Sequence, residues 1–245
     1  MADTPKPRKR RSRKTAAKPA PLRSFSRVLR RGAFWSVAGI AGFVLVWTLL
    51  YVLINPPTNA YMFSESRRLG GVQQDWVPME RIAPVMARSA VAAEDANFCL
   101  HWGLDVNAIR TAMERGTGGA STISQQVVKN VFLWHGRSWA RKTIEALWTP
   151  VVEVFWSKRR ILEIYLNVAE FDDGVFGVQA AAQHYFGVDA AGLTATQAAR
   201  LAAILPAPKE RSASNPGSFT RNRAAQIISG AETIAADGRA DCFQE

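Results

Sequence analysis

The longest apolar segment of the chain lies near its N-terminus. Residues 33–54 carry no formal charge and are rich in Val, Leu, Ile, Phe and Trp. As a helix, this segment extends about 33 Å, which is enough to cross a hydrocarbon core of about 30 Å. Phe34 and Trp35 at one end and Tyr51 at the other suit the two membrane interfaces. The pattern therefore predicts a retained transmembrane helix that ends before two prolines.

A cleaved signal peptide is the alternative interpretation of the same segment. Its hydrophobic region would span about 7–15 residues, which is shorter than the apolar run seen here. The sequence Thr58-Asn59-Ala60 is also a poor cleavage site. The retained anchor is favoured over both a signal peptide and a buried core helix.

Beyond residue 76 the apolar positions recur mostly at helical spacing. Two capping boxes, Thr122 with Gln125 and Thr194 with Gln197, predict helix starts. Further helices are expected over 85–93 after Pro84, over 177–186 up to Gly187, and over 220–236. One buried stripe is expected from Ile161, Leu162, Tyr165, Leu166, Val168 and Ala169. The run 139–156 is also helical in pattern, with a kink or break expected at Pro150.

The net charge of +11 is confined to the N-terminal tail. Residues 1–31 hold twelve of the 31 Lys and Arg residues but one of the 20 acidic residues, so the rest of the chain has 19 of each sign. A neutral folded part argues against a nucleic-acid-binding face. Cations directly before the span place the N-terminus in the cytoplasm and everything after residue 55 outside it.

These patterns predict one extracytoplasmic domain on a membrane anchor. The expected order is a basic cytoplasmic tail (1–31), a transmembrane helix (33–54), a stem (55–75), a mainly α-helical domain (76–236) and a C-terminal tail (237–245). Cys99 and Cys242 are too few for a disulfide framework. An oxidising compartment would permit a bond between them, but two unpaired thiols are the favoured expectation.

Four polar clusters could take part in catalysis or binding, and each could instead have a purely structural role. Taken by itself, the pair Glu94-Asp95 near His101 would be a solvated helix end. No second His or Cys lies at metal-ligand spacing, so no metal site is expected. The small-residue turn at 118–124 suits an anionic ligand at a helix N-terminus, but also describes an ordinary capped helix. Arg141, Lys142 and Glu145 would share one helix face, as in a surface ion pair worth under about 1 kcal/mol. The fourth cluster, 158–163, completes a local excess of basic residues that suits lipid headgroups as well as a substrate.

The order and spacing of the four clusters are far more specific than any one of them. They read Glu94-Asp95-x-x-Phe98-x-x-His101-x-Gly103, Gly119-Ala120-Ser121-Thr122-Ile123-Ser124-Gln125-Gln126-x-x-Lys129-Asn130, Arg141-Lys142-x-x-Glu145 and Lys158-x-x-Ile161-Leu162-Glu163-x-Tyr165-Leu166-Asn167. This series closely resembles the family 51 glycosyltransferases, the peptidoglycan glycosyltransferases, from about residue 76 to residue 216. The chain ends about 190 residues after the span and lacks the Ser-x-x-Lys tetrad of a penicillin-binding nucleophile. The resemblance is therefore to the monofunctional biosynthetic transglycosylases of that family.

The resemblance implies a mainly α, lysozyme-like helical domain with a smaller membrane-facing jaw lobe. It implies lipid II, a disaccharide-pentapeptide on undecaprenyl pyrophosphate, as substrate. The growing chain would be the donor and the next lipid II the acceptor. The product would be a β-1,4 glycan strand formed with inversion at the anomeric carbon and release of undecaprenyl pyrophosphate.

The same resemblance assigns roles to individual residues. Glu94 takes the role of general base and Glu145 that of a second essential carboxylate. Expected substrate-binding residues are Asp95, His101, Ser121, Thr122, Gln125, Gln126, Lys129 and Asn130, with Arg141, Lys142 and Lys158 at the pyrophosphate. No cofactor is required, and a divalent cation such as Mg²⁺ at the pyrophosphate is left open.

Two other classes of function remain as alternatives. A lysozyme-like hydrolase or lytic transglycosylase would act on finished glycan and would need no cation cluster for a lipid pyrophosphate. A non-catalytic scaffold of the division machinery would not require Glu94 and Glu145 together. The favoured transferase would reside in the bacterial inner membrane with lipid II, the glycan chain and the membrane as partners. Other cell-wall synthesis or division proteins are candidate partners, and nucleic acid is not.

Overall fold

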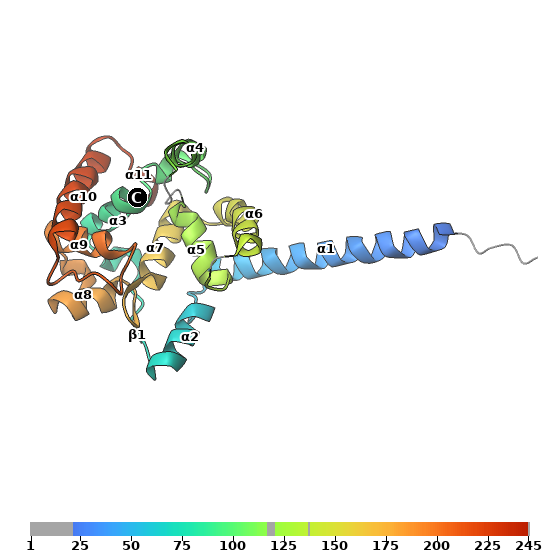
Figure 1. Cartoon of the computed structure of the whole chain (residues 1–245), viewed down its shortest axis with the longest axis horizontal. Coiled ribbons are helices and arrows are strands. Elements are labelled where there is room, and N and C mark those ends of the chain that lie inside the picture. Colours follow the sequence, from blue (N-terminus) through green and yellow to red (C-terminus); the bar gives the residue numbers. More distant parts are fainter. Residues whose placement is uncertain (1–21, 117–120, 137, 245) are drawn as a thin grey trace, which may run out of the picture. The chain divides into compact units, whose positions relative to one another are not determined.

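The computed structural model is mainly helical, as predicted, and describes residues 22–116, 121–136 and 138–244 (Figure 1). Its α-helices are α1 (Leu22–Leu53), α2 (Ala60–Leu69), α3 (Pro84–Glu94), α4 (Val106–Arg115), α5 (Ile123–Phe132), α6 (Trp139–Phe155), α7 (Lys158–Val168), α8 (Val178–Phe186), α9 (Ala195–Ile204), α10 (Ser218–Ala236) and α11 (Asp241–Gln244). Short 3₁₀ helices are η1 (Met79–Arg81), η2 (Phe98–Leu100) and η3 (Ala190–Gly192). Strands are β1 (Gln73–Gln74), β2 (Glu170–Asp172) and β3 (Val175–Phe176).

The predicted membrane helix is present as α1. Its stretch Arg27–Leu53 has a mean hydropathy of 2.1 and is long and apolar enough to cross a membrane. Exposed apolar side chains such as Phe34, Trp35 and Ile40 would contact lipid rather than a protein core. Most of the basic tail expected at 1–31 lies outside the described residues. The side of the membrane on which each end lies stays a prediction.

The chain divides into two compact units, residues 1–43 and residues 44–245. The last turns of α1 therefore belong to the second unit, with the rest of the folded chain. Within this unit Thr48 is fully buried, and its hydroxyl accepts a hydrogen bond from Trp148 Nε1 over 2.9 Å. Trp156 Nε1 donates to the Thr48 carbonyl, also over 2.9 Å. The two indole N–H groups thus fix the end of α1 to α6 and to the residue that follows it.

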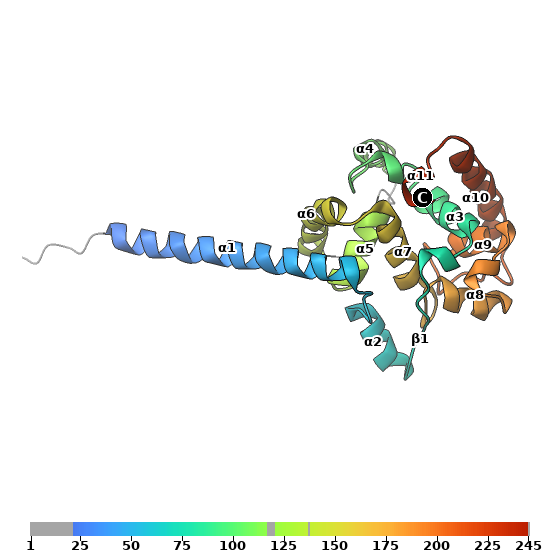
Figure 2. The same cartoon turned by 180° about the vertical axis from the view of Figure 1, so that it is seen from behind.

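Two groups of helices form the core of the second unit. Helices α3, α9 and α10 pack against one another, and α5 packs against α6 and α7 (Figures 1 and 2). The stripe expected on α7 is buried: Ile161, Leu162, Tyr165 and Leu166 are at most 1% exposed. Helix α7 therefore supplies the central layer against which the motif-bearing α5 lies.

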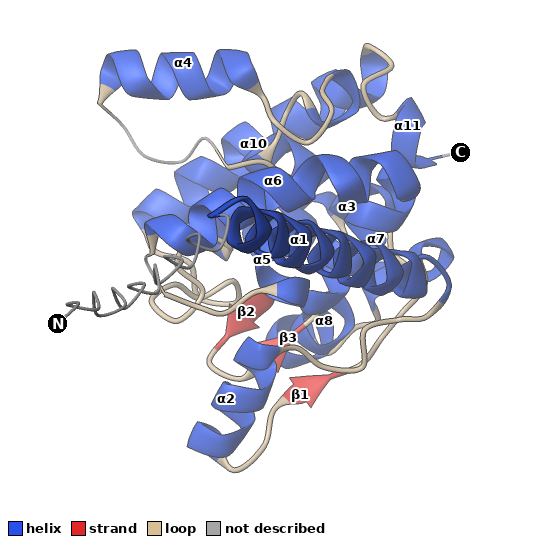
Figure 3. Ribbon diagram, turned by 90° about the vertical axis from the view of Figure 1, so that its right-hand side faces the viewer, coloured by secondary structure: helices blue, strands red, loops and turns tan. Residues whose placement is uncertain are grey.

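A small sheet lies beside these helices. Its strand order is β1-β3-β2, with β1 parallel and β2 antiparallel to β3. Helix α8 packs against all three strands (Figure 3). The sheet brings the segment after α2 next to the segment after α7, although about 100 residues separate them in sequence.

Most of the predicted helix limits are confirmed, because they rest on local chemistry. Thr122 and Thr194 both form complete capping boxes. Helix α8 ends at Gly187, whose φ of 64° is left-handed and suits glycine. A break at Pro150 is wrong, because α6 continues through this residue to Phe155. Its neighbours Trp148, Thr149 and Val152 are buried, so tertiary packing supports the helix despite the missing N–H.

The expectation of two unpaired thiols is wrong. Cys99 and Cys242 form a disulfide across a sequence separation of 143 residues. Helix α11 returns the end of the chain to η2, where Phe243 is fully buried near Phe98 with ring centroids 6.3 Å apart. Cys242 and Phe243, in the segment 237–245 that was expected to be a tail, are thus packed on the motif that carries Glu94. No local pattern in the sequence indicates this return.

Candidate active site

Glu94 is the last residue of α3 and is held by a neutral partner. Gln126 of α5 donates its side-chain amide N–H to Glu94 Oε2 over 2.9 Å. Burial raises the pKa of Glu94, while the Gln126 hydrogen bond and nearby cations oppose that rise. A carboxyl group whose pKa lies above its usual range is suited to accept a proton near neutral pH.

Asp95 and His101 connect the first motif to the start of α5. Asp95 Oδ1 lies 2.8 Å from His101 Nε2, and Asp95 Oδ2 accepts the backbone N–H of Ile123 over 3.0 Å. Gly103 donates its backbone N–H to His101 Nδ1 over 3.1 Å, so the ring proton lies on Nε2 and points at Asp95. Both predicted substrate-binding residues therefore hold the backbone around Glu94. Their contact with substrate stays a prediction.

Thr122 and Gln125 also bind backbone in this structure. The Thr122 hydroxyl donates to the carbonyl of Gly103 over 2.6 Å, and Gln125 Oε1 accepts the Thr122 N–H. Gly103 has a φ of +81°, and a Cβ there would lie 2.5 Å from the methyl group of Thr149. Only glycine fits this approach, which explains why the first motif includes one.

Glu145 organises two cations on the third motif. Its side chain is 2% exposed and pairs with Arg141 over 2.5 Å. Lys142 Nζ pairs with the other Glu145 oxygen and donates to the Ser121 hydroxyl over 2.9 Å. The structure thus brings Arg141, Lys142 and Glu145 together on one helix face, as expected, and adds Ser121 as a partner of Lys142. Residues 117–120 of the preceding turn, including Gly119 and Ala120 of the second motif, lie outside the described residues.

Lys158 lies in a different network from the other predicted pyrophosphate partners. Its Nζ donates to Glu153 Oε1 and to the carbonyl of His101, each over 2.8 Å, and lies 4.4 Å from the Phe98 ring centroid. Burial lowers the pKa of Lys158, while Glu153 opposes that shift. Glu153 Oε1 also accepts the Ser124 hydroxyl, so Lys158, Glu153 and Ser124 form one hydrogen-bonded group. The role of Lys158 at a pyrophosphate stays a prediction.

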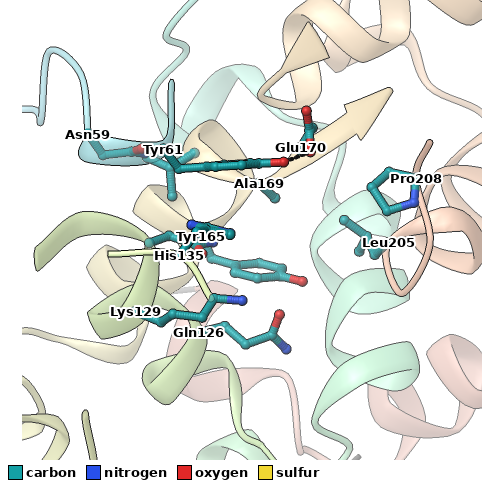
Figure 4. Close-up of a pocket in the computed structure, with 12 residues that line it drawn as sticks. Asn59, Tyr61, Gln126, Lys129, His135, Tyr165, Ala169, Glu170, Leu205 and Pro208 are labelled. Atoms are coloured by element: carbon teal, nitrogen blue, oxygen red, sulfur yellow. Dashed lines mark hydrogen bonds between the residues drawn. The ribbon is translucent and has the colours of Figure 1, made fainter. Parts of the chain in front are cut away.

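A cavity of about 180 Å³ is lined in part by Gln126, the residue that binds Glu94 (Figure 4). It is lined by Asn59, Tyr61, Gln126, Lys129, Asn130, His135, Tyr165, Val168, Ala169, Glu170, Leu205 and Pro208. Gln126 and Lys129 point into it from α5, while Leu205 and Pro208 lie on the other side. Burial lowers the pKa of Lys129, whose charge interacts with both Glu94 and Glu145. Lys129 therefore lines the same cavity as Gln126, the residue that binds Glu94.

Tyr61, His135 and Glu170 line this cavity and were not predicted. The Tyr61 and His135 rings stack at a centroid distance of 3.6 Å, and the Tyr61 hydroxyl donates to Glu170 Oε2 over 2.7 Å. Burial raises the pKa of Tyr61 to about 12 and lowers that of His135 to about 4, so both are neutral near pH 7. These residues lie in the stem, after α5 and in β2, outside all four motifs. Their positions in the sequence carry no signal that joins them.

One cluster of carboxylates lies close enough to suit a metal ion among residues 22–116, 121–136 and 138–244. It consists of Glu65, Glu170 and Asp173. Lys209 Nζ lies 2.7, 3.3 and 3.0 Å from their oxygens, and Arg68 pairs with two of them. Two cations of the protein, Lys209 and Arg68, thus pair with these three carboxylates. Both oxygens of Glu145 likewise pair with cations of the protein, and a divalent cation at the pyrophosphate stays a prediction.

Comparison with known proteins identifies relatives over nearly the whole chain. The family model described as transglycosylase matches residues 62–232. A biosynthetic peptidoglycan transglycosylase of Jannaschia sp. is 55% identical over 235 residues, covering 96% of this chain and 98% of its own length. Proteins of the same name from Caulobacter vibrioides and Pseudomonas entomophila are 45% and 48% identical, covering 81% and 84% of this chain and 89% and 90% of their own lengths.

Proposed function

We propose that this chain, which belongs to the transglycosylase family, polymerises lipid II into glycan strands. One observation carries the proposal. Gln126 in the first turn of α5 binds Glu94, and Ser121 just before that helix binds Lys142, the partner of Glu145, so the candidate base and the cation-bearing carboxylate meet at one helix start. A transfer from a pyrophosphate donor needs a base at the acceptor and positive charge at the leaving group.

In the proposed reaction, Glu94 removes the proton from the acceptor 4-hydroxyl as its oxygen attacks the anomeric carbon of the donor. The bond from that carbon to the pyrophosphate oxygen breaks, and the configuration inverts from α to β. The hydrogen bond from neutral Gln126 orients Glu94 without tying its carboxylate to a cation, which leaves an oxygen available to the proton. Arg141 and Lys142 stabilise the charge that develops on undecaprenyl pyrophosphate.

Glu145 serves this step by holding the two cations. The buried Glu145 carboxylate pairs with Arg141 through one oxygen and with Lys142 through the other. The positions of these two cations are therefore fixed before substrate binds. Ser121 receives a hydrogen bond from Lys142 and so helps to orient its ammonium group. The proposed mechanism uses these protein cations and assigns no step to a resident metal.

The membrane helix suits a substrate that is itself held in a bilayer. We propose that the folded unit lies on the extracytoplasmic side of a bacterial inner membrane, where lipid II and the growing strand would meet it. Other cell-wall synthesis or division proteins are proposed partners. The catalytic domain predicted over 76–236 is a proposal too, and the packing of Thr48 and Phe243 favours a larger folding unit.

The experiment that tests the function is incubation of the full-length chain with lipid II in detergent. We expect long uncrosslinked glycan. Glu94→Gln keeps the side chain's size but removes the base, so turnover should fall about 10²–10⁴-fold with little change in substrate binding. Glu114→Gln, an exposed acidic residue of α4, is the matched control and should polymerise normally.

Two outcomes would overturn the proposal. The first is shortened glycan from purified sacculi with no polymer from lipid II, which would indicate the hydrolase. The second is near-normal polymerisation by Glu94→Gln, which would remove Glu94 from the mechanism whatever the family assignment.

A further inference from the structure

Arg223 of α10 binds the end of the helix that carries Glu94. Its guanidinium donates to the backbone carbonyl of Ala93 over 3.0 Å. Ala93 precedes Glu94 in the last turn of α3, where carbonyl groups have no partner within the helix. A cation at this end also offsets the negative end of the helix dipole. Arg223 therefore caps α3 across a sequence separation of 130 residues.

The helix that presents Arg223 is closely packed on α3. A Cβ at Gly230 would lie 3.2 Å from the Ala92 Cβ, so the two backbones approach closely there. Ala224 and Ile227, on the same helix as Arg223, are buried with Ala93 packed against them. This contact fixes the position of the guanidinium relative to the end of α3.

We propose that Arg223 is a positioning residue for Glu94, which holds the end of α3 and keeps a positive charge beside the carboxylate. The inference rests on the proposed function, because it concerns the same base. None of the four sequence motifs includes Arg223. Its own hydrogen bond is to backbone, so it acts through Glu94 rather than on the substrate.

Three other titratable groups also face Glu94. Lys129 of α5 favours its ionised form, and the adjacent Asp95 disfavours it, while buried Tyr165 of α7 interacts with Glu94 and has a pKa raised by burial. Arg223 favours the ionised form of Glu94 and so opposes the effect of burial on its pKa. Loss of the Arg223 charge should therefore raise the pKa of Glu94 further. Since the base acts when deprotonated, activity should then be lost mainly on the acid side.

The test is the rate of lipid II polymerisation by full-length protein from about pH 5 to pH 9. Arg223→Gln and Arg223→Met remove the charge, and Arg223→Lys retains it. We expect the two neutral variants to lose about tenfold more activity at the acid end than at the alkaline end. Arg223→Lys should keep the wild-type acid limb. Arg221→Gln is the matched control, because Arg221 lies on the same helix but is exposed and bonds the Pro216 carbonyl.

The outcomes separate this proposal from the proposed function. If the wild type and Arg221→Gln make no glycan, the function itself fails. If both polymerise and the neutral Arg223 variants lose activity equally at every pH, Arg223 is a structural cap and the positioning role is overturned. If the neutral variants unfold in a melting experiment, the test rests on Arg223→Lys. A polymerisation rate that falls at the same acid pH as in the wild type supports the proposal. A fall that begins at a different pH overturns it.

Discussion

Gln126 donates a hydrogen bond to Glu94 over 2.9 Å, and no ion pair with Glu94 occurs among the residues that the structure describes. The contrast with Glu145 is chemical. Glu145 has one oxygen paired with Arg141 and the other with Lys142, which suits it to hold these two cations in place. Two carboxylates of one site are thus placed in environments that suit different roles.

The burial of Glu94 predicts that this carboxylate, although needed for activity, lowers the stability of the folded protein at alkaline pH. Because burial raises its pKa in the folded protein, the folded state holds the proton at pH values where the unfolded state, with an ordinary pKa of about 4.3, has lost it. Stability therefore falls as the pH rises from the unfolded pKa through the folded pKa. Glu94→Gln should melt above the wild type at about pH 8 and show no advantage near pH 4. A lower melting temperature at pH 8 than the wild type's would contradict this.

Glu145→Gln should impair polymerisation severely, about 10²-fold or more, because Arg141 and Lys142 lose the anion that orients them. The melting temperature should also fall, since two partly buried cations lose a charged partner. The double variant with Glu94→Gln should be far less impaired than the product of the two single losses, because both residues serve one transition state. The measurement is glycan formed per minute for both single variants and the double. Losses that multiply would mean that the two residues act in separate steps.

The disulfide should support stability rather than chemistry. Replacing both cysteines in Cys99→Ser/Cys242→Ser should lower the free energy of unfolding by about 2–4 kcal/mol. Polymerisation at a temperature well below the melting point should remain near normal, because neither sulfur is available as a nucleophile when bonded. A reducing agent should lower the melting temperature of the wild type and leave that of the double variant unchanged. A several-hundredfold loss of turnover with the fold intact would assign Cys99 a role in the site.

The sequence predicted those features that local chemistry determines. The spacing of Thr122 and Gln125 is the capping-box pattern, which predicts a helix start from local sequence. The helical spacing of Ile161 and Tyr165 likewise predicts a buried face. The four motifs also placed Glu145 with its two cations, because those residues lie within one and a half helical turns.

Contacts between segments that are far apart in the sequence could not be predicted from local patterns. Tyr61 and His135 stack only because α2 folds back beside α5, and Cys99 reaches Cys242 only because α11 returns to η2. The break expected at Pro150 was wrong for the same reason, since packing around Trp148 outweighs a local helix-breaking preference. The backbone hydrogen bonds that Asp95 and His101 accept were not foreseen either, and contact of these residues with substrate stays a prediction.

Membrane orientation can be tested with reporter fusions at the C-terminus. The basic residues before α1 predict that the C-terminus lies outside the cytoplasm. A phosphatase that functions only outside the cytoplasm should be active there, and a reporter that functions only inside should not. Reversing the charge asymmetry, with the cations of the tail replaced and Lys residues added after the span, should weaken the phosphatase signal. The opposite pattern for the unaltered chain would overturn the assignment.

Thr48 should be a stability determinant although it lies within the apolar helix α1. Thr48→Val preserves the shape of the side chain but removes the acceptor of Trp148 Nε1, while the carbonyl that accepts Trp156 Nε1 remains. A buried indole N–H without a partner costs about 1–3 kcal/mol, so the melting temperature in detergent should fall measurably. Thr48→Ser keeps a hydroxyl and should recover part of the loss. Thr143→Val is the matched control, because Thr143 makes the same bond to a carbonyl four residues earlier but is exposed. Equal melting curves for Thr48→Val and Thr143→Val would show that the end of α1 is not fixed to the folded unit through this hydroxyl.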